Sequence, residues 1–107
     1  KKVEFDNALS GSIGLECMFG GLSNIFPLNK TIDILTRGKN NLSITQNKIQ
    51  VGSKAEMTLF DPDFTYTFKE EHILSTSKNC AFIGQKMNGK VYGVINNNNL
   101  YESKLWV

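Results

Sequence analysis

The 107-residue sequence has little of the chemistry that small enzymes and metal centres use. Its two cysteines, Cys17 and Cys80, are too few for a disulfide scaffold. Its one histidine, His72, leaves no set of about four ligands for a tetrahedral zinc site. His72 would also have to serve any Ser–His–Asp or Cys–His catalytic system. Because it lies in the charged segment 69–74, we interpret His72 as a solvated surface residue in a short turn of helix.

Strong charge of one sign and long apolar runs are absent as well. The 12 basic and 10 acidic residues give a net charge of +2, which offers no electrostatic reason to expect a nucleic acid or a membrane surface as a partner. No segment approaches the roughly 18 apolar residues of a membrane-spanning helix. Lys1 and Lys2 precede acidic and polar residues instead of an apolar run, so we expect no signal peptide and a cytoplasmic protein.

Apolar spacings of three and four residues predict a helix over 13–26 that is apolar around much of its circumference. Pro27 should end it. A second helix is predicted over 30–37, with Asn29 as its N-cap and Gly38 as its stop. An apolar, glycine-rich first helix needs more partner surface than so short a chain obviously provides. We therefore expect these residues to be part of something larger.

After residue 52 the apolar pattern changes to a period of two, which is typical of strands. Strands are predicted over 55–60 and 64–68, separated by an Asp-Pro-Asp turn at 61–63. A third strand is predicted over 89–95, with a turn at 96–99. Two helices followed by strands predict an α+β organisation.

The aromatic and sulfur-containing side chains favour structural roles. Alternating aromatics could stack nucleic-acid bases, but no basic groove accompanies them, so we predict a core position for the set Phe60, Phe64, Tyr66 and Phe68. Cys17, on the apolar helix, is expected to be buried and inert. Cys80 lies in a predicted loop, and we expect no redox role for it.

Three segments, in this order, resemble the C-terminal quarter of dihydroorotases, which are cyclic amidohydrolases. Residues 5–16 read FDNALSGSIGLE and are similar to a family loop followed by an Ile-Gly-Leu-Glu helix start. Residues 47–61 read NKIQVGSKAEMTLFD and resemble the family's return into a small β-domain. Residues 75–84 read STSKNCAFIG and are followed by MNGKV at 87–91, again as in dihydroorotases. The second motif is shared by many amidohydrolases, whereas the first and third are more specific.

The resemblance implies an α/β parent, a TIM-barrel amidohydrolase with a small β-domain. Residues 1–46 would be the last barrel loop and the C-terminal helices of the (β/α)₈ barrel, and residues 47–107 the C-terminal strands of the small β-domain. The implied activity is the reversible, metal-dependent hydrolysis of dihydroorotate to N-carbamoyl-aspartate in pyrimidine biosynthesis. In this family zinc ions, held by histidines, an aspartate and a carboxylated lysine, activate a hydroxide that attacks the ring amide.

None of the family's metal ligands or its catalytic acid/base matches a residue of this chain, so we expect no zinc bound by the chain and no activity from it alone. The resemblance implies a role only for the family's substrate-binding loop. The two residues of that loop that contact the substrate match Ser10 and Gly11 of this chain. A glycine there lets the backbone approach a ligand, and backbone N–H groups could hold a substrate carboxylate. The simpler interpretation is that Gly11 only makes a turn before a helix. The expected partners are dihydroorotate, an N-terminal barrel segment and a second copy of the protein.

The sequence leaves two other interpretations open. Leu9-Ser10 stands where the family has Pro-Phe, and residues 39–41 read KNN where it has Asn-Pro-Ala. These departures motivate an inactive dihydroorotase homologue with a structural or assembly role. The third interpretation is an independently folded binding module, against which stands the apolar helix at 13–26.

Overall fold

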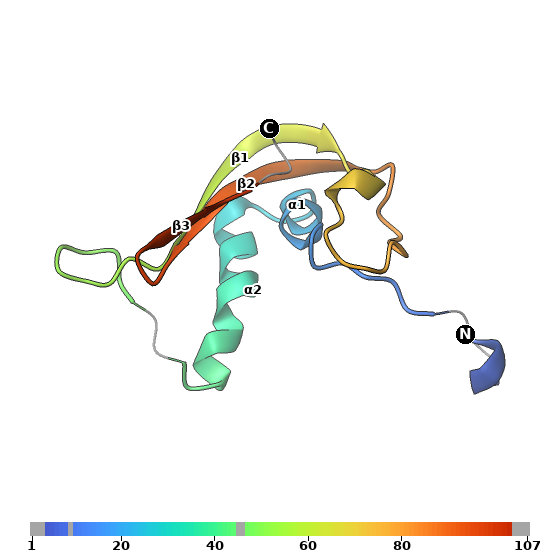
Figure 1. Ribbon diagram of the computed structural model, residues 1–107, viewed down its shortest axis with the longest axis horizontal. Helices are drawn as coiled ribbons and strands as arrows, with labels where there is room; N and C mark the ends of the chain where they lie inside the picture. The colour runs from blue at the N-terminus through green and yellow to red at the C-terminus, as the bar shows by residue number, and fades with distance from the viewer. Residues whose placement is uncertain (1–3, 9, 45–46, 104–107) are drawn as a thin grey trace.

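Two short helices and a three-stranded sheet make up the computed structural model, which describes residues 4–8, 10–44 and 47–103 (Figure 1). The elements, in chain order, are the 3₁₀ turn η1 (Phe5–Asn7), α1 (Met18–Ser23), α2 (Leu28–Asn41), β1 (Met57–Thr67), the 3₁₀ turn η2 (Glu70–His72), β2 (Lys86–Asn96) and β3 (Asn99–Glu102). The predicted order of helices followed by strands is therefore confirmed, and the described residues form a small α+β unit.

The sheet is antiparallel, with β2 between β1 and β3. It arches over α1, while α2 runs away from the sheet (Figure 1). β2 and β3 are joined by the two-residue turn Asn97-Asn98, whose φ angles of 49° and 61° are those of a type I′ hairpin. The turn predicted at 96–99 is thus confirmed.

β1 is one strand, so the predicted turn at residues 61–63 is wrong. The five β1 residues from Asp61 to Thr65 oppose the three residues Asn88–Lys90 of β2, which marks an irregularity in the pairing. The turn chemistry is still present, since the Asp63 N–H donates to Asp61 Oδ1 at 2.9 Å. Pro62 lacks an N–H and is tolerated because it lies at a bulge of an edge strand. Residues 61–63 therefore form a bulge within one strand instead of a turn between two strands.

The first helix is much shorter than the predicted 13–26, because α1 covers only Met18–Ser23. Residues 11–14 are not helical, and the Ile13 N–H donates to Asn79 O instead of entering a helix. The two central glycines also disfavour helix formation by about 1 kcal/mol each. One of them has a packing role, since a Cβ on Gly20 would lie 2.8 Å from Met87 Cβ. The tertiary contacts therefore override the apolar spacing.

The second helix is longer than predicted and differs at both ends. α2 begins after Pro27, not after Asn29, and the Pro27 carbonyl accepts from the N–H groups of Lys30 and Thr31. It continues through Gly38 and ends where Ser43 adopts φ 54° and the Ile44 N–H reaches back to the carbonyl of residue 39. A serine thus takes the left-handed position that glycine usually supplies.

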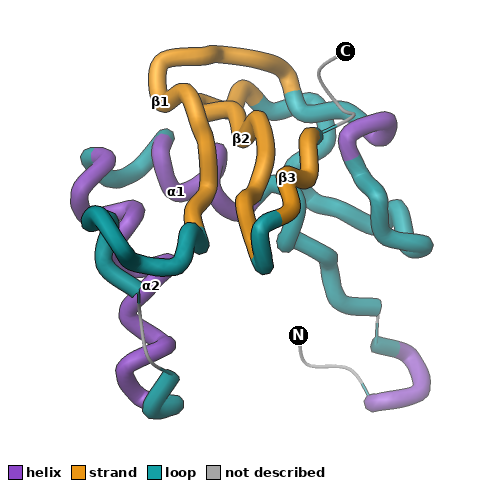
Figure 2. The backbone as a smooth tube through the Cα atoms, turned by 60° about the vertical axis from the view of Figure 1, so that its left-hand side comes forward, coloured by secondary structure: helices purple, strands orange, loops and turns teal. Residues whose placement is uncertain are grey.

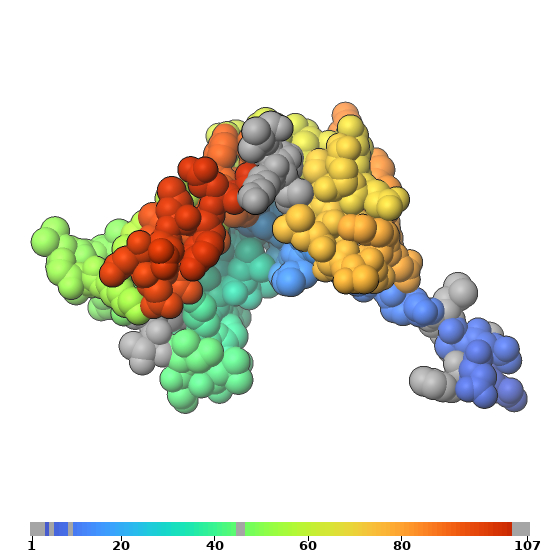
Figure 3. All heavy atoms as spheres, in the orientation of Figure 1, coloured from blue at the N-terminus to red at the C-terminus, as the bar shows by residue number. Residues whose placement is uncertain are grey.

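The core is small for a chain of this length. Among the described residues, the buried hydrophobic side chains are Cys17, Phe68, Ile73 and Met87. The Cα radius of gyration is 16.4 Å, against about 13 Å for a compact chain of similar length. Figure 3 shows the arched outline, with the N-terminal segment projecting from the rest. The predicted core aromatics are split, because Phe68 is buried and Tyr66 half-buried but Phe64 is 37% exposed.

Large apolar side chains are exposed on several elements, including Leu15, Ile25, Ile34, Leu100 and Tyr101. This agrees with the expectation that the helices need additional partner surface. Within the described ranges, no helix has the length and apolar character needed to cross a membrane.

Adjacent glycines of α1 offer a test of this packing. Gly20→Ala should destabilise the protein by about 1–3 kcal/mol, because the new Cβ forces Met87 to move. Gly21→Ala is the matched control: no atom lies within 4 Å of its Cβ, so the substitution should be neutral or stabilise by up to about 1 kcal/mol. Urea unfolding of both variants measures the difference. Equal effects of the two substitutions would contradict the close approach of α1 to β2.

Candidate functional site

The two motifs that are most specific in the sequence lie against one another. The segment that leads into α1 runs beside the long loop between η2 and β2 (Figures 1 and 2). We call the contact between residues 11–16 and residues 75–81 the motif seam. It is built by hydrogen bonds between segments more than 55 residues apart in the chain.

Three hydrogen bonds join the two segments of the motif seam at one end. The Ile13 N–H donates to Asn79 O at 2.9 Å. The Asn79 side-chain amide donates to Gly11 O at 2.7 Å, and the Ala81 N–H donates to Ser12 Oγ at 2.9 Å. Because Asn79 uses both its backbone and its side chain, it fixes the path of the chain immediately after Gly11.

A carboxylate closes the other end of the seam. Glu16 Oε1 accepts hydrogen bonds from the backbone N–H of Ser75, at 2.8 Å, and from its hydroxyl. These bonds lower the pKa of Glu16 below its ordinary value, because both stabilise the ionised carboxylate. Glu16 therefore acts as an anion that orders the start of the 75–81 loop.

Ser10 lies directly before the seam and Gly11 is its first residue, and both are exposed. A Cβ on Gly11 would meet no atom of the described residues within 4 Å, so no close contact among them requires glycine there. Leu9, the other half of the departure from the family pattern, lies outside the described residues. The substrate-binding role of Ser10 and Gly11 stays a prediction.

The two cysteines meet at the inner side of the seam. Cys17 Sγ and Cys80 Sγ are 3.9 Å apart, and Cys17 is buried as predicted. Burial raises the pKa of Cys17 to about 11, with Cys80 contributing through its hydrogen bond. Nothing in the sequence indicates that the two cysteines, which are 63 residues apart, are neighbours in space.

His72 is not the solvated surface residue that its charged neighbours suggest. Its side chain is only 12% exposed, and its ring lies against Tyr66 and Phe68 at centroid distances of 5.4 and 5.7 Å. Its Nδ1 accepts from the Lys69 N–H at 3.0 Å. Desolvation lowers the pKa of His72, which favours the neutral ring. These contacts give His72 a structural role at the start of η2.

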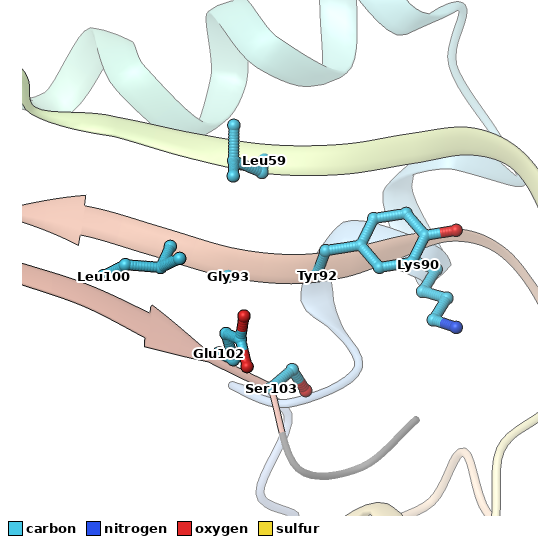
Figure 4. Close-up of a pocket in the computed structure, with 7 residues that line it drawn as sticks. All are labelled: Leu59, Lys90, Tyr92, Gly93, Leu100, Glu102 and Ser103. Carbon is cyan, nitrogen blue, oxygen red and sulfur yellow. The ribbon is translucent and has the colours of Figure 1, made fainter. Parts of the chain in front are cut away.

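A shallow hollow of about 240 Å³ lies on the outer face of the sheet, where Figure 4 shows Leu59, Tyr92 and Leu100 around Gly93. Its floor is backbone, because a Cβ on Gly93 would come 2.7 Å from the carbonyl oxygen of residue 101. The ammonium of Lys90 lies over the Tyr92 ring at 4.6 Å, a cation–π contact. Apolar side chains over a backbone floor are typical of a packing surface, not of a catalytic site.

A larger groove of about 770 Å³ opens between α2 and the inner face of the sheet. Apolar side chains from both sides line it, including Ile32, Leu35, Phe60, Val91 and Val94. Lys39 and Glu56 lie at its edge and add charges of opposite sign. The groove is open apolar surface in the part of the molecule where a core would be expected.

No metal centre is formed by the residues that the structure describes. Within residues 4–8, 10–44 and 47–103, no three His, Cys, Asp or Glu side chains gather closely enough to hold an ion. The described geometry is therefore that of a small α+β unit with one ordered loop junction and with open apolar surface.

Comparisons with known proteins agree with the motifs. No family model matches the chain. The dihydroorotase of Caldicellulosiruptor saccharolyticus is 34% identical over 104 residues, which cover 91% of this chain and 24% of that enzyme. The dihydroorotase of Clostridium acetobutylicum is 36% identical over 97% of this chain and 26% of its own length. That of Chlorobaculum tepidum is 29% identical over 94% of the chain.

The resemblance to dihydroorotases is therefore confirmed along nearly the whole chain. The chain spans about a quarter of the length of the curated relatives it matches, which is consistent with a C-terminal portion.

Glu16→Gln tests the electrostatic part of the seam. At pH 7 the substitution should cost about 1 kcal/mol of stability, because a neutral amide accepts the two Ser75 hydrogen bonds less strongly. The folded-state pKa of Glu16 is lowered, so its contribution is present above the unfolded value of about 4.3 and is lost as the pH falls through the folded value.

Unfolding free energies of wild type and variant should thus differ at pH 7 and converge as the pH falls through the lowered folded-state pKa of Glu16. The exposed Glu70 on η2 provides the control substitution, Glu70→Gln. A gap between wild type and Glu16→Gln that is independent of pH would show that the carboxylate charge is not what orders Ser75.

Proposed function

We propose that this chain is the C-terminal portion of a dihydroorotase-like cyclic amidohydrolase. The whole protein would catalyse the reversible hydrolysis of dihydroorotate to N-carbamoyl-aspartate. The observation that carries this proposal is the motif seam, in which the first and third family-like motifs are held together by direct hydrogen bonds. Two motifs that were matched independently in the sequence thus form one structural unit.

Within this proposal, the seam's task is to present the loop at Ser10 and Gly11 to the substrate. The Asn79 amide donates to Gly11 O, which fixes this carbonyl toward Asn79, and in this proposal the backbone N–H groups of residues 10–12 would bind an anionic ligand. Dihydroorotate carries a carboxylate, which backbone N–H groups and a serine hydroxyl can bind. The contribution of this chain is to bind and orient the substrate.

The catalytic chemistry would belong to other residues of the same protein. Zinc is the metal we propose, and it would supply an activated hydroxide when bound. The described residues do not fit such a metal, because they offer no group of three ligands. We place the zinc ligands and the acid/base in the remainder of the polypeptide, which in the relatives is about three times as long as the matched part.

The same remainder would cover the open apolar surface. In this proposal residues 1–46 complete a (β/α)₈ barrel and residues 47–107 complete a small β-domain. The 770 Å³ groove between α2 and the sheet is the surface that these missing elements would fill. Association with a second copy and a cytoplasmic location stay predictions.

Kinetics of the full-length protein test the proposal. Zinc-loaded enzyme should hydrolyse dihydroorotate, whereas residues 1–107 alone should not. Gly11→Ala should raise KM roughly tenfold with a smaller change in kcat, because the added Cβ blocks a backbone contact with the substrate. The fold should tolerate the change, since no atom lies within 4 Å of the new Cβ.

Gly38→Ala is the matched control, because Gly38 is exposed on α2 and its Cβ would also meet nothing. An unchanged KM for Gly11→Ala would remove Gly11 from the substrate site. Absence of turnover in the full-length, metal-loaded protein would overturn the enzymatic proposal and favour the inactive homologue with an assembly role, to which the Ser10 departure points.

A further inference from the structure

The sulfur atoms of Cys17 and Cys80 face one another across the motif seam at 3.9 Å. Cys17 immediately precedes α1, and Cys80 lies in the loop between η2 and β2. The two residues are 63 positions apart in the chain, so their contact is a product of the fold. Both are free thiols in the structure.

The surroundings hold the two thiols together without using them. The residues on either side of Cys80 are bonded to the segment before α1: Asn79 O accepts from the Ile13 N–H, and the Ala81 N–H donates to Ser12 Oγ. The only other described partner of the pair is the carbonyl of Gly14, to which Cys17 Sγ donates weakly at 3.4 Å.

The two sulfur atoms are in non-bonded contact at 3.9 Å. A bond requires the sulfur atoms to approach to about 2.05 Å. Rotation of the Cys80 side chain with a small movement of its loop can supply this, because Cys80 lies in a segment without helix or strand. Cys17 itself is 2% exposed and packs with Phe68 and Met87, so its position is fixed.

The two cysteines are unequal in access. Cys17 is buried in the core. Burial raises the pKa of Cys17, so its thiol is protonated at neutral pH. Cys80 is half-buried at the surface of the same cluster. An oxidant in solution would therefore meet Cys80 first, and Cys17 would act as the second, resolving thiol.

We propose that Cys17 and Cys80 are a redox modification site that forms a reversible intramolecular disulfide with a small-molecule disulfide as the oxidant. The Cys80 thiolate attacks one sulfur of the oxidant and releases one small thiolate. Cys17 passes its proton to that thiolate or to water, and its sulfur attacks Cys80 Sγ. The mixed disulfide breaks, and the second small thiolate leaves and takes up from solvent the proton that Cys80 lost on ionising.

In the net reaction, two protein thiols lose two electrons and two protons, and one small disulfide is reduced to two small thiols. The product joins the two halves of the motif seam covalently. A bond across so long a loop restricts the unfolded chain and should raise the thermal midpoint of unfolding. In a reducing compartment the pair stays open, as is usual for reversible intracellular disulfides. This inference does not depend on the proposed enzymatic function.

The test uses the folded, full-length protein in buffers with increasing ratios of oxidised to reduced glutathione. After alkylation of the remaining thiols, peptide mapping should find a cross-linked peptide containing Cys17 and Cys80, which disappears when the reduced form is in excess. The oxidised protein should unfold at a higher temperature than the reduced one.

Two variants separate the steps. Cys17→Ser should stop at a glutathione adduct on Cys80, and Cys80→Ser should leave Cys17 unmodified; neither should gain thermal stability in the oxidising buffer. The mapping of wild-type protein decides the matter even if a variant does not fold. Wild-type protein that stops at the glutathione adduct, or whose two cysteines both remain open to alkylation at the highest ratio, would overturn the proposal.

Discussion

The interaction on which the rest of this structure depends is the pairing of residues 11–16 with residues 75–81. It joins the segment that enters α1 to the loop that enters β2, and these are the elements whose packing makes the core. Close approach is required there, since Gly89 has φ 102° and lies directly against the Phe19 ring. Without the pairing, neither the entry to α1 nor the long loop would have a defined path.

The same pairing explains why so small a core holds together. Cys17, Phe68, Ile73 and Met87 come from four parts of the chain, and each lies within a few residues of a hydrogen bond or ladder that joins distant segments. Beyond this cluster the molecule exposes apolar surface on α2 and on both faces of the sheet. Such surface is typical of a unit that completes a larger fold.

The sequence predicted the kinds of elements better than their limits. The strand predicted from the alternation at 89–95 and the Asn-rich turn after it are confirmed, because local chemistry determines both. The helix over 13–26 failed because a tertiary hydrogen bond from Ile13 outweighs its apolar spacing. The turn at 61–63 failed because a bulge uses the same Asp-Pro-Asp chemistry as a turn. His72 was misplaced because the aromatic rings that bury it are not adjacent in sequence.

In the candidate site, too, the sequence indicates some residues and only the tertiary structure indicates the others. Ser10 and Gly11 came from resemblance. The structure adds Asn79, which holds Gly11, and the Glu16–Ser75 contact, which orders the loop that carries Asn79. Native-state hydrogen exchange of the amides of Ile13, Ser75 and Ala81 tests this account most directly. If the seam is one unit, the three amides open with a common free energy, above that of the exposed loops. Independent opening, with Ser75 exchanging freely while Ile13 stays protected, would contradict it.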